Sequence, residues 1–200
     1  FCHDLYTGKL AWTQEFPSEI ERHHKQNSSA SSTVTADSRG IYWLWGTSQN
    51  VRLEALTHDG KSRWSIDLGP YIGHHGFGGS PVVWKDTVIV PLEQDTQGTV
   101  IGIDASTGKE RWRLARDGAE KAAYSTPLVL THTGRDTQVI CTSKAHGMYA
   151  INPENGTVLW ENKCFSLRTV ASPICAGNLL IGTCGSGGGG SNLLVALKPP

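Results

Sequence analysis

Two histidine pairs are the residues of this sequence that most invite metal chemistry. His23 is followed by His24, and His74 is followed by His75 and a glycine. Neutral imidazole is a common ligand for zinc, copper and iron. Adjacent residues of an extended chain point in opposite directions, so each pair offers at most one ligand, and no carboxylate stands at a helpful fixed spacing. We therefore favour hydrogen-bonded or solvated loop histidines, with a metal site as the less favoured alternative.

Familiar catalytic motifs are missing from the sequence. It contains no Gly-x-Ser-x-Gly elbow, no P-loop and no His-Glu-x-x-His. The glycine-rich run 185–191 does not precede a helix, so it reads as a loop and not as a phosphate cradle. The five cysteines show no C-x-x-C spacing, which argues against a zinc ribbon and favours buried thiols: Cys2, Cys141, Cys164, Cys175 and Cys184.

The amino-acid composition favours one fold class and argues against some classes of partner. The 200 residues include 18 Lys+Arg and 18 Asp+Glu, and this zero net charge gives no general attraction to nucleic acid or anionic membranes. No apolar stretch is long enough to span a bilayer. The chain has 23 Gly and 7 Trp but 1 Met, which favours a loop-rich all-β protein over long helices.

An internal repeat indicates the structural elements that would position the candidate site residues. Four segments carry a glycine followed four residues later by a tryptophan, and these tryptophans are 52, 48 and 48 residues apart. A second marker, Ser/Thr-Pro, recurs with its prolines 46 residues apart, with 32–34 as a degenerate first copy. The four pairs, to which we assign packing between repeats, are Gly8 and Trp12, Gly60 and Trp64, Gly108 and Trp112, and Gly156 and Trp160.

Each repeat has the pattern of four short strands. In one copy, β-branched and alternating runs over 80–84, 87–92, 99–104 and 110–114 are bounded by turn residues. Gly108 suits the tight turn before the last run because glycine readily adopts positive φ. The sequence therefore predicts four-stranded antiparallel meanders, and a period of 46 to 52 residues favours the blades of a β-propeller.

The repeated Ala-x-Asp-x-x-Thr-Gly-Lys-x-x-Trp pattern, followed by Ser-Pro-Val, resembles the PQQ-like, or quinoprotein-type, propeller repeat. It stands most completely at 101–112 and 149–160. The family includes an outer-membrane assembly lipoprotein and quinoprotein dehydrogenases. The resemblance implies seven or eight blades in a complete protein, and a periplasmic, secreted or envelope-associated location.

The positions of the repeat markers indicate that the chain holds about four blades in all. We expect the last strand of one blade in 1–16, blades in 17–69, 70–116 and 117–164, and an incomplete blade in 165–200. The favoured interpretation is a segment of a larger propeller. The alternative is a four-bladed ring in which the first strand completes the last blade.

The loops that enter the blades, and those between their second and third strands, should gather at one mouth of the propeller channel. Ligand sites favour such a mouth. The residues that we expect there as ligand-binding candidates are His74, His75, Lys121, Tyr124, Lys144, His146 and Arg168.

Two functions follow from the resemblance. The favoured one is a non-catalytic, extracytoplasmic module that binds protein partners or acts as a scaffold, with no cofactor. The alternative is a PQQ-dependent oxidoreductase that uses calcium and has its site mostly outside this segment. Such enzymes commonly carry a vicinal disulfide, and this sequence has no adjacent cysteines.

Overall fold

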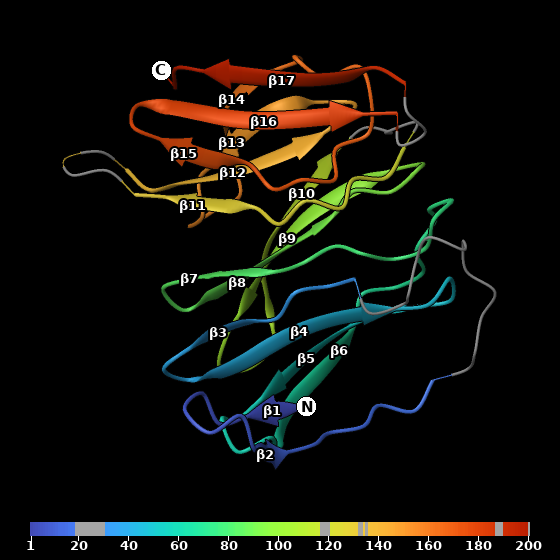
Figure 1. Cartoon of the computed structure of the whole chain (residues 1–200), viewed down its shortest axis with the longest axis vertical. Coiled ribbons are helices and arrows are strands. Elements are labelled where there is room, and N and C mark those ends of the chain that lie inside the picture. Colours follow the sequence, from blue (N-terminus) through green and yellow to red (C-terminus); the bar gives the residue numbers. More distant parts are fainter. Residues whose placement is uncertain (19–30, 117–120, 132–133, 135, 187–189, 200) are drawn as a thin grey trace.

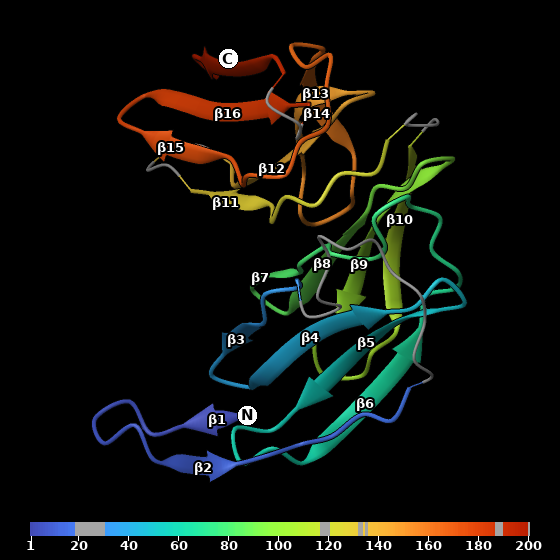
Figure 2. The ribbon, with the colours of Figure 1, turned by 45° about the vertical axis from the view of Figure 1, so that its right-hand side comes forward.

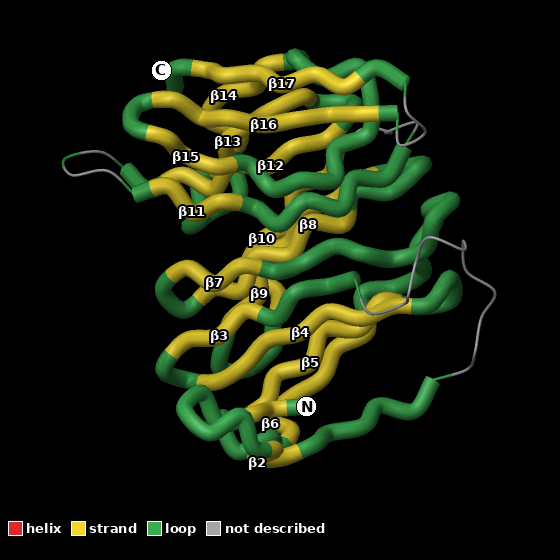
Figure 3. Tube along the Cα trace, viewed as in Figure 1, coloured by secondary structure: helices red, strands yellow, loops and turns green. Residues whose placement is uncertain are grey.

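The computed structural model describes residues 1–18, 31–116, 121–131, 134, 136–186 and 190–199, and His23 and His24 lie outside them. The described residues form strands and loops without any helix (Figure 3). The strands make five antiparallel sheets that follow one another along the chain. In chain order, the sheets are β1 (Cys2–His3) and β2 (Leu10–Trp12); β3 (Thr35–Asp37), β4 (Gly40–Gly46), β5 (Val51–Leu56) and β6 (Ser62–Asp67); β7 (Val82–Trp84), β8 (Thr87–Leu92), β9 (Gly98–Asp104) and β10 (Glu110–Arg116); β11 (Leu128–Leu130), β12 (Gln138–Ser143), β13 (Gly147–Ile151) and β14 (Val158–Asn162); and β15 (Ile174–Ala176), β16 (Leu179–Gly185) and β17 (Asn192–Leu197).

The sheets stack face to face, with the first sheet at one end and the fifth at the other (Figure 1). The first strands of the second to fifth sheets, β3, β7, β11 and β15, follow one another along one side of the stack (Figures 1 and 2). Apolar side chains fill the gaps between neighbouring sheets from the second to the fifth, as Leu53 and Ile101 do between the second and third. The predicted all-β architecture of four-stranded antiparallel propeller blades is confirmed.

The N-terminal segment differs from the single strand expected in 1–16. It forms two strands, because β1 pairs with β2 across the turn that begins at Asp4. The four-bladed ring is also wrong for this chain. β1 and β2 pair with each other alone, β17 pairs with β16, and the two sheets lie at opposite ends of the stack (Figure 1).

A tight turn precedes the last strand of each four-stranded sheet. In the third sheet, Asp104 Oδ1 accepts hydrogen bonds from the backbone N–H groups of Ser106 and Thr107, at 3.0 and 2.8 Å. Gly108 has a φ of +73°, and its N–H donates to the Asp104 carbonyl at 2.9 Å. Hydrogen bonds from the Ser106 hydroxyl and from Arg111 hold the pKa of the Asp104 carboxyl well below its usual range. The repeated Asp-x-x-Thr-Gly sequence is thus a self-bonded turn.

A β-bulge lies directly before the tryptophan of each last strand. In the third sheet, Glu110 pairs with Ile103 and Trp112 with Gly102, which leaves Arg111 without a residue opposite it. The same shift occurs in the second and fourth sheets. Because a bulge bends its strand and re-aims the next side chain, it determines where the tryptophan points.

Three of the four repeat tryptophans dock onto the turn of the following sheet. Each indole N–H donates to a backbone carbonyl of that turn: Trp12 to His58 at 2.9 Å, Trp64 to Ala105 at 3.2 Å, and Trp112 to Pro153 at 3.1 Å. Trp160 instead donates to Gln138 Oε1 of its own sheet, at 2.9 Å.

The turn glycine of the following sheet makes room for the docked ring. A Cβ at Gly156 would lie 2.4 Å from Trp112 Cε3, and one at Gly60 would lie 2.7 Å from Trp12. Gly8, in the first turn, has a φ of +67° but no atom of another residue near its Cβ position. A glycine in these turns therefore meets two separate demands, a positive φ and a close ring.

A buried polar cluster joins the third and fourth sheets. The Tyr149 hydroxyl donates to Glu93 Oε1 at 2.5 Å, and both side chains are buried. The Arg116 guanidinium lies 4.3 Å from the Tyr149 ring centre and donates to Glu161 Oε2 at 2.6 Å. His146 Nδ1 lies 3.3 Å from the same oxygen. Burial raises the pKa of Glu93, so ionising this carboxyl opposes folding.

The two demands on the turn glycines can be separated by substitution. Gly156→Ala and Gly8→Ala both place a side chain at positive φ, which costs about 1 kcal/mol. Only Gly156→Ala also drives a methyl group into Trp112, and overpacking costs about 1–3 kcal/mol more. Urea unfolding followed by tryptophan fluorescence should therefore show the larger loss for Gly156→Ala. Equal losses would contradict inter-sheet docking as the reason for this glycine.

The buried Glu93 predicts how stability depends on pH. Since its pKa is higher in the folded state, its contribution is most favourable at acid pH and is lost as the pH rises through the folded pKa. Glu93→Gln removes that loss, so the free energy of unfolding of the variant minus that of the wild type should increase from acid to neutral pH. Urea titrations across this range measure the difference, with the exposed Glu154→Gln as control. A difference that falls with pH would contradict the raised pKa.

Candidate functional site

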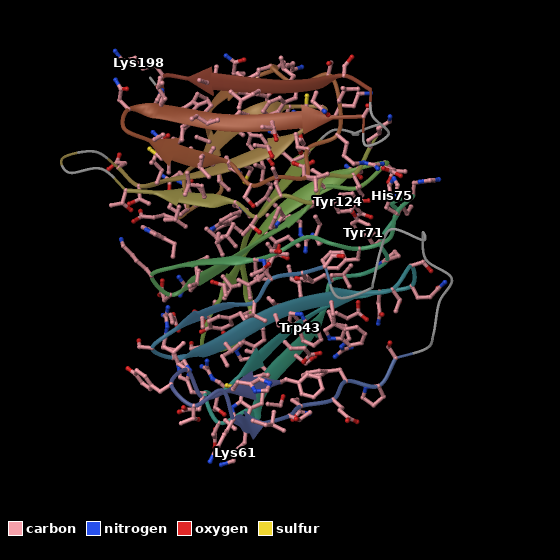
Figure 4. All side chains as sticks on the ribbon, viewed as in Figure 1. Trp43, Lys61, Tyr71, His75, Tyr124 and Lys198 are labelled. Atoms are coloured by element: carbon pink, nitrogen blue, oxygen red, sulfur yellow. The ribbon has the colours of Figure 1, made fainter. Side chains whose placement is uncertain are left out.

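An open groove of about 1300 Å³ lies at the loop end of the first strands. The described residues entering the second, third, fourth and fifth sheets line it, together with the ends of β16 and β17. Tyr71, His75 and Tyr124, from two of these entry loops, gather at one edge of the stack (Figure 4). Segments far apart in sequence thus form one continuous surface, which we call the groove.

Four of the seven ligand candidates line the groove: His75, Lys121, Tyr124 and Arg168. His74 is not among the lining residues; its ring packs edge-on against that of His75, with centres 4.7 Å apart. Lys144 lies in the turn between β12 and β13, also outside the lining. His146 belongs to the buried polar cluster with Glu161. The expected convergence therefore holds in space for four residues, whereas His74, Lys144 and His146 lie apart from the groove.

Tyr124 connects three of the entry loops. Its backbone N–H donates to the Thr169 carbonyl of the next loop at 3.1 Å. Its ring lies under the Arg168 guanidinium, 5.5 Å from the ring centre. A Cβ at Gly78 of the preceding loop would come within 3.1 Å of the same ring. Burial raises the pKa of the Tyr124 phenol, against an opposing effect of Arg168, so the hydroxyl is a neutral donor at physiological pH.

The loop after β8 holds the entry loops from beneath. Asp95 accepts hydrogen bonds from the backbone N–H groups of His74 and Ala122, through its two carboxylate oxygens. The Glu93 carbonyl accepts one from the Ala123 N–H at 3.2 Å. One loop of the third sheet therefore fixes two entry loops, and the Asp95 charge is taken up by backbone donors.

The groove has a positive lining in a chain without net charge. Lys121 and Arg168 line it, and none of its described lining residues is an aspartate or glutamate. Val170, Leu193 and Leu194 add apolar surface and are 60%, 43% and 66% exposed. Such a surface suits an anionic group with apolar neighbours.

Hydroxyl groups along the first strands are lining residues that the sequence reasoning did not select. Thr33, Ser80, Thr126 and Ser172 all line the groove. Ser80 Oγ accepts from the Thr33 N–H at 2.9 Å, and Ser172 Oγ from the Thr126 N–H at 3.0 Å, each bond joining two adjacent sheets. The recurring Ser/Thr-Pro marker carries this signal, because each of these hydroxyls belongs to one of its copies.

The described residues gather no group of three or more His, Cys, Asp or Glu side chains able to hold a metal ion. The five cysteines are free thiols in the structure. No helix with the length and apolar character of a membrane span occurs in the described part of the chain.

Solved structures with similar folds include two kinds of protein. BamB from Moraxella catarrhalis aligns with a TM-score of 0.54 at 20% identity, covering 76% of this chain and 46% of that chain. The quinohemoprotein alcohol dehydrogenase ADHIIG from Pseudomonas putida HK5 aligns with a TM-score of 0.54 at 15% identity, covering 74% and 30%. The corresponding enzyme from Comamonas testosteroni gives 0.53 at 14% identity, covering 74% and 31%.

This chain spans less than half the length of each of these structures. At such identities the likeness shows a common fold and nothing about activity. No curated protein sequence matches the chain. The family model described as outer membrane protein assembly factor BamB matches residues 49–199, well over half of the sequence. With its docked tryptophan repeats and stacked four-stranded sheets, the chain belongs to this family of PQQ-like β-propellers.

Proposed function

We propose that this chain is a non-catalytic binding module that holds a protein partner in the groove, outside the cytoplasm. The observation that carries the proposal is the make-up of the groove, in which exposed aliphatic side chains lie beside Tyr124, Lys121 and Arg168. Aromatic residues and arginine next to apolar surface are typical of the centres of protein interfaces. The family's description as an assembly factor supports a protein partner and an extracytoplasmic location.

The shape of the groove also favours a polypeptide ligand. Its 1300 Å³ exceed the usual range of small-molecule pockets, about 300–1000 Å³. The segments entering four consecutive sheets contribute to it, so an extended ligand would contact several sheets at once. Repeat proteins commonly bind partners on such continuous concave surfaces.

The PQQ-dependent alternative requires calcium beside the cofactor, and the described groove residues do not fit that ion. Calcium takes six to eight oxygen ligands and usually includes carboxylates among them. No carboxylate lies in the described lining, and the nearby Asp95 is bonded to backbone donors. Lys121 and Arg168 would oppose a divalent cation. We therefore derive no catalytic step through PQQ from these residues.

Site-specific photo-crosslinking tests the proposed function. A photoreactive amino acid placed at Val170 or at Leu194, both exposed in the groove, should capture the same protein partner in envelope extracts. The same amino acid at Leu159, 43% exposed on β14 and outside the groove, should not. Equal capture from all three positions would contradict a specific binding face.

A separate experiment tests the alternative of a PQQ-dependent oxidoreductase. Titration of the protein with PQQ and calcium, followed by quinone absorbance and dye-linked alcohol oxidation, should show neither saturable binding nor turnover. Saturable, calcium-dependent binding together with turnover would replace the binding module by an oxidoreductase.

A further inference from the structure

Arg168 stands apart from the other arginines in the described part of the chain. Arg39, Arg52, Arg111, Arg113 and Arg116 each pair with a carboxylate, and Arg63 donates to a backbone carbonyl. Among the described residues the Arg168 guanidinium forms no ion pair with a carboxylate, and its Nε, like that of the ion-paired Arg116, is buried without a hydrogen-bond partner. Its contact is the Tyr124 ring. No carboxylate of the described groove lining therefore compensates the Arg168 charge.

An unsatisfied buried donor is expensive to maintain. Leaving one without an acceptor costs about 1–3 kcal/mol, and more when the group is charged. The backbone holds Arg168 in place nevertheless, because the Gly185 N–H donates to its carbonyl at 3.0 Å and the two residues form a β-bridge. A side chain fixed at this cost inside a groove points to a ligand that supplies the missing acceptor.

A second hydrogen-bond donor, the Tyr124 hydroxyl, lies near the Arg168 guanidinium. The Tyr124 hydroxyl is also buried, near the Tyr71 hydroxyl and the His75 backbone, and it makes no hydrogen bond of good geometry with the described residues. Its protonated state makes it a donor, and the ring lies next to Arg168. Lys121, three residues earlier in the same loop, lines the groove and is exposed. Two cations and one neutral hydroxyl thus converge, with no described acidic residue in the lining to neutralise them.

The residues around Arg168 indicate which kind of anionic ligand the groove would bind. Arg pairs well with planar carboxylates through two parallel hydrogen bonds. Val170, Leu193 and Leu194 are exposed in the same groove, and a free inorganic anion would leave them in contact with water. A ligand that combines a carboxylate with aliphatic groups satisfies both parts of the surface.

We propose that Arg168, Tyr124 and Lys121 form a carboxylate receptor for an extended segment of a partner protein in which acidic and aliphatic residues alternate. Arg168 pairs with the carboxylate, Tyr124 donates to it, and Lys121 contributes a longer-range attraction. The aliphatic side chains of the segment pack on Val170, Leu193 and Leu194. This inference rests on the proposed function, because it specifies which partner segment the groove accepts.

Fluorescence anisotropy with matched peptides tests the receptor. The probe is a fluorescein-labelled peptide with the core Leu-Glu-Leu-Asp-Leu, and its twin carries Gln and Asn in place of Glu and Asp. A charge-assisted pair contributes about 1.5–3 kcal/mol, which corresponds to roughly tenfold or more in affinity. The acidic peptide should therefore bind at least tenfold more tightly than its twin, and added salt should narrow the gap.

Variants assign that difference to the named residues. Arg168→Gln should remove the preference for the acidic peptide, and Tyr124→Phe should weaken binding severalfold. Lys163→Gln removes an exposed charge outside the groove and should leave binding unchanged. Without peptide, Arg168→Gln should resist urea as well as the wild type or better, because it removes an unsatisfied guanidinium. This readout shows that a loss of binding is not a loss of folding.

Several outcomes would overturn the inference while leaving the proposed function in place. One is equal binding of the two peptides, and another is an acid preference that survives Arg168→Gln. A third is crosslinking from Val170 that is unaffected by Arg168→Gln. Displacement of the peptide by succinate at equal concentration would reassign the site to small carboxylates. Loss of all groove-specific crosslinking in the wild type would instead contradict the proposed function itself.

Discussion

The contact between a tryptophan and the next sheet's turn is the interaction on which the rest of this structure depends. A single four-stranded sheet has two faces to bury, and it can bury them only against its neighbours. Trp112 meets both Gly102 of its own sheet and Gly156 of the following one. Its indole N–H also fixes the direction of docking through the Pro153 carbonyl. Repeated from the first sheet to the fourth, this contact helps to set the spacing between sheets and so the line of entry loops, whereas Trp160 bonds within its own sheet.

The shape of the groove depends on that spacing between sheets. Entry loops of successive sheets come close enough for Tyr124 to contact both Gly78 and Arg168. Asp95 and the Glu93 carbonyl then hold the same loops from below. Glu93 has two roles, because its carbonyl holds an entry loop and its side chain accepts a hydrogen bond from Tyr149 in the buried polar cluster. Loops without regular structure are thereby held by side chains and backbone groups of the rigid sheets.

Polar residues in and near the groove differ in whether they hold the structure together. Asp95 and His146 have partners that hold elements of the protein together. The Arg168 side chain has no such partner among the described residues, although the hydroxyl of the next residue, Thr169, donates to the Thr142 carbonyl at 3.2 Å. The distinction between an arginine with an ion pair and one without is what separates a binding candidate from a structural residue here, since Arg116 Nε also lacks a hydrogen-bond partner among the described residues. It cannot be seen from residue type, since both kinds occur in similar loops.

The sequence by itself determined the repeat, the four-stranded sheets and the turn chemistry, because local signals carry these features. Asp104 and Gly108 fold their own turn, and strand boundaries such as Thr87–Leu92 follow from alternation and flanking turn residues. The tertiary structure alone decided the bulge before each tryptophan, the second strand within 1–16, and the separation of His146 from Arg168. The first two outcomes depend on register within a hairpin, as in the pairing of Trp112 with Gly102, and the third depends on contacts between residues far apart in the chain, as in the bond from Tyr149 to Glu93. Local patterns do not encode such pairings, since they arise only when neighbouring sheets pack.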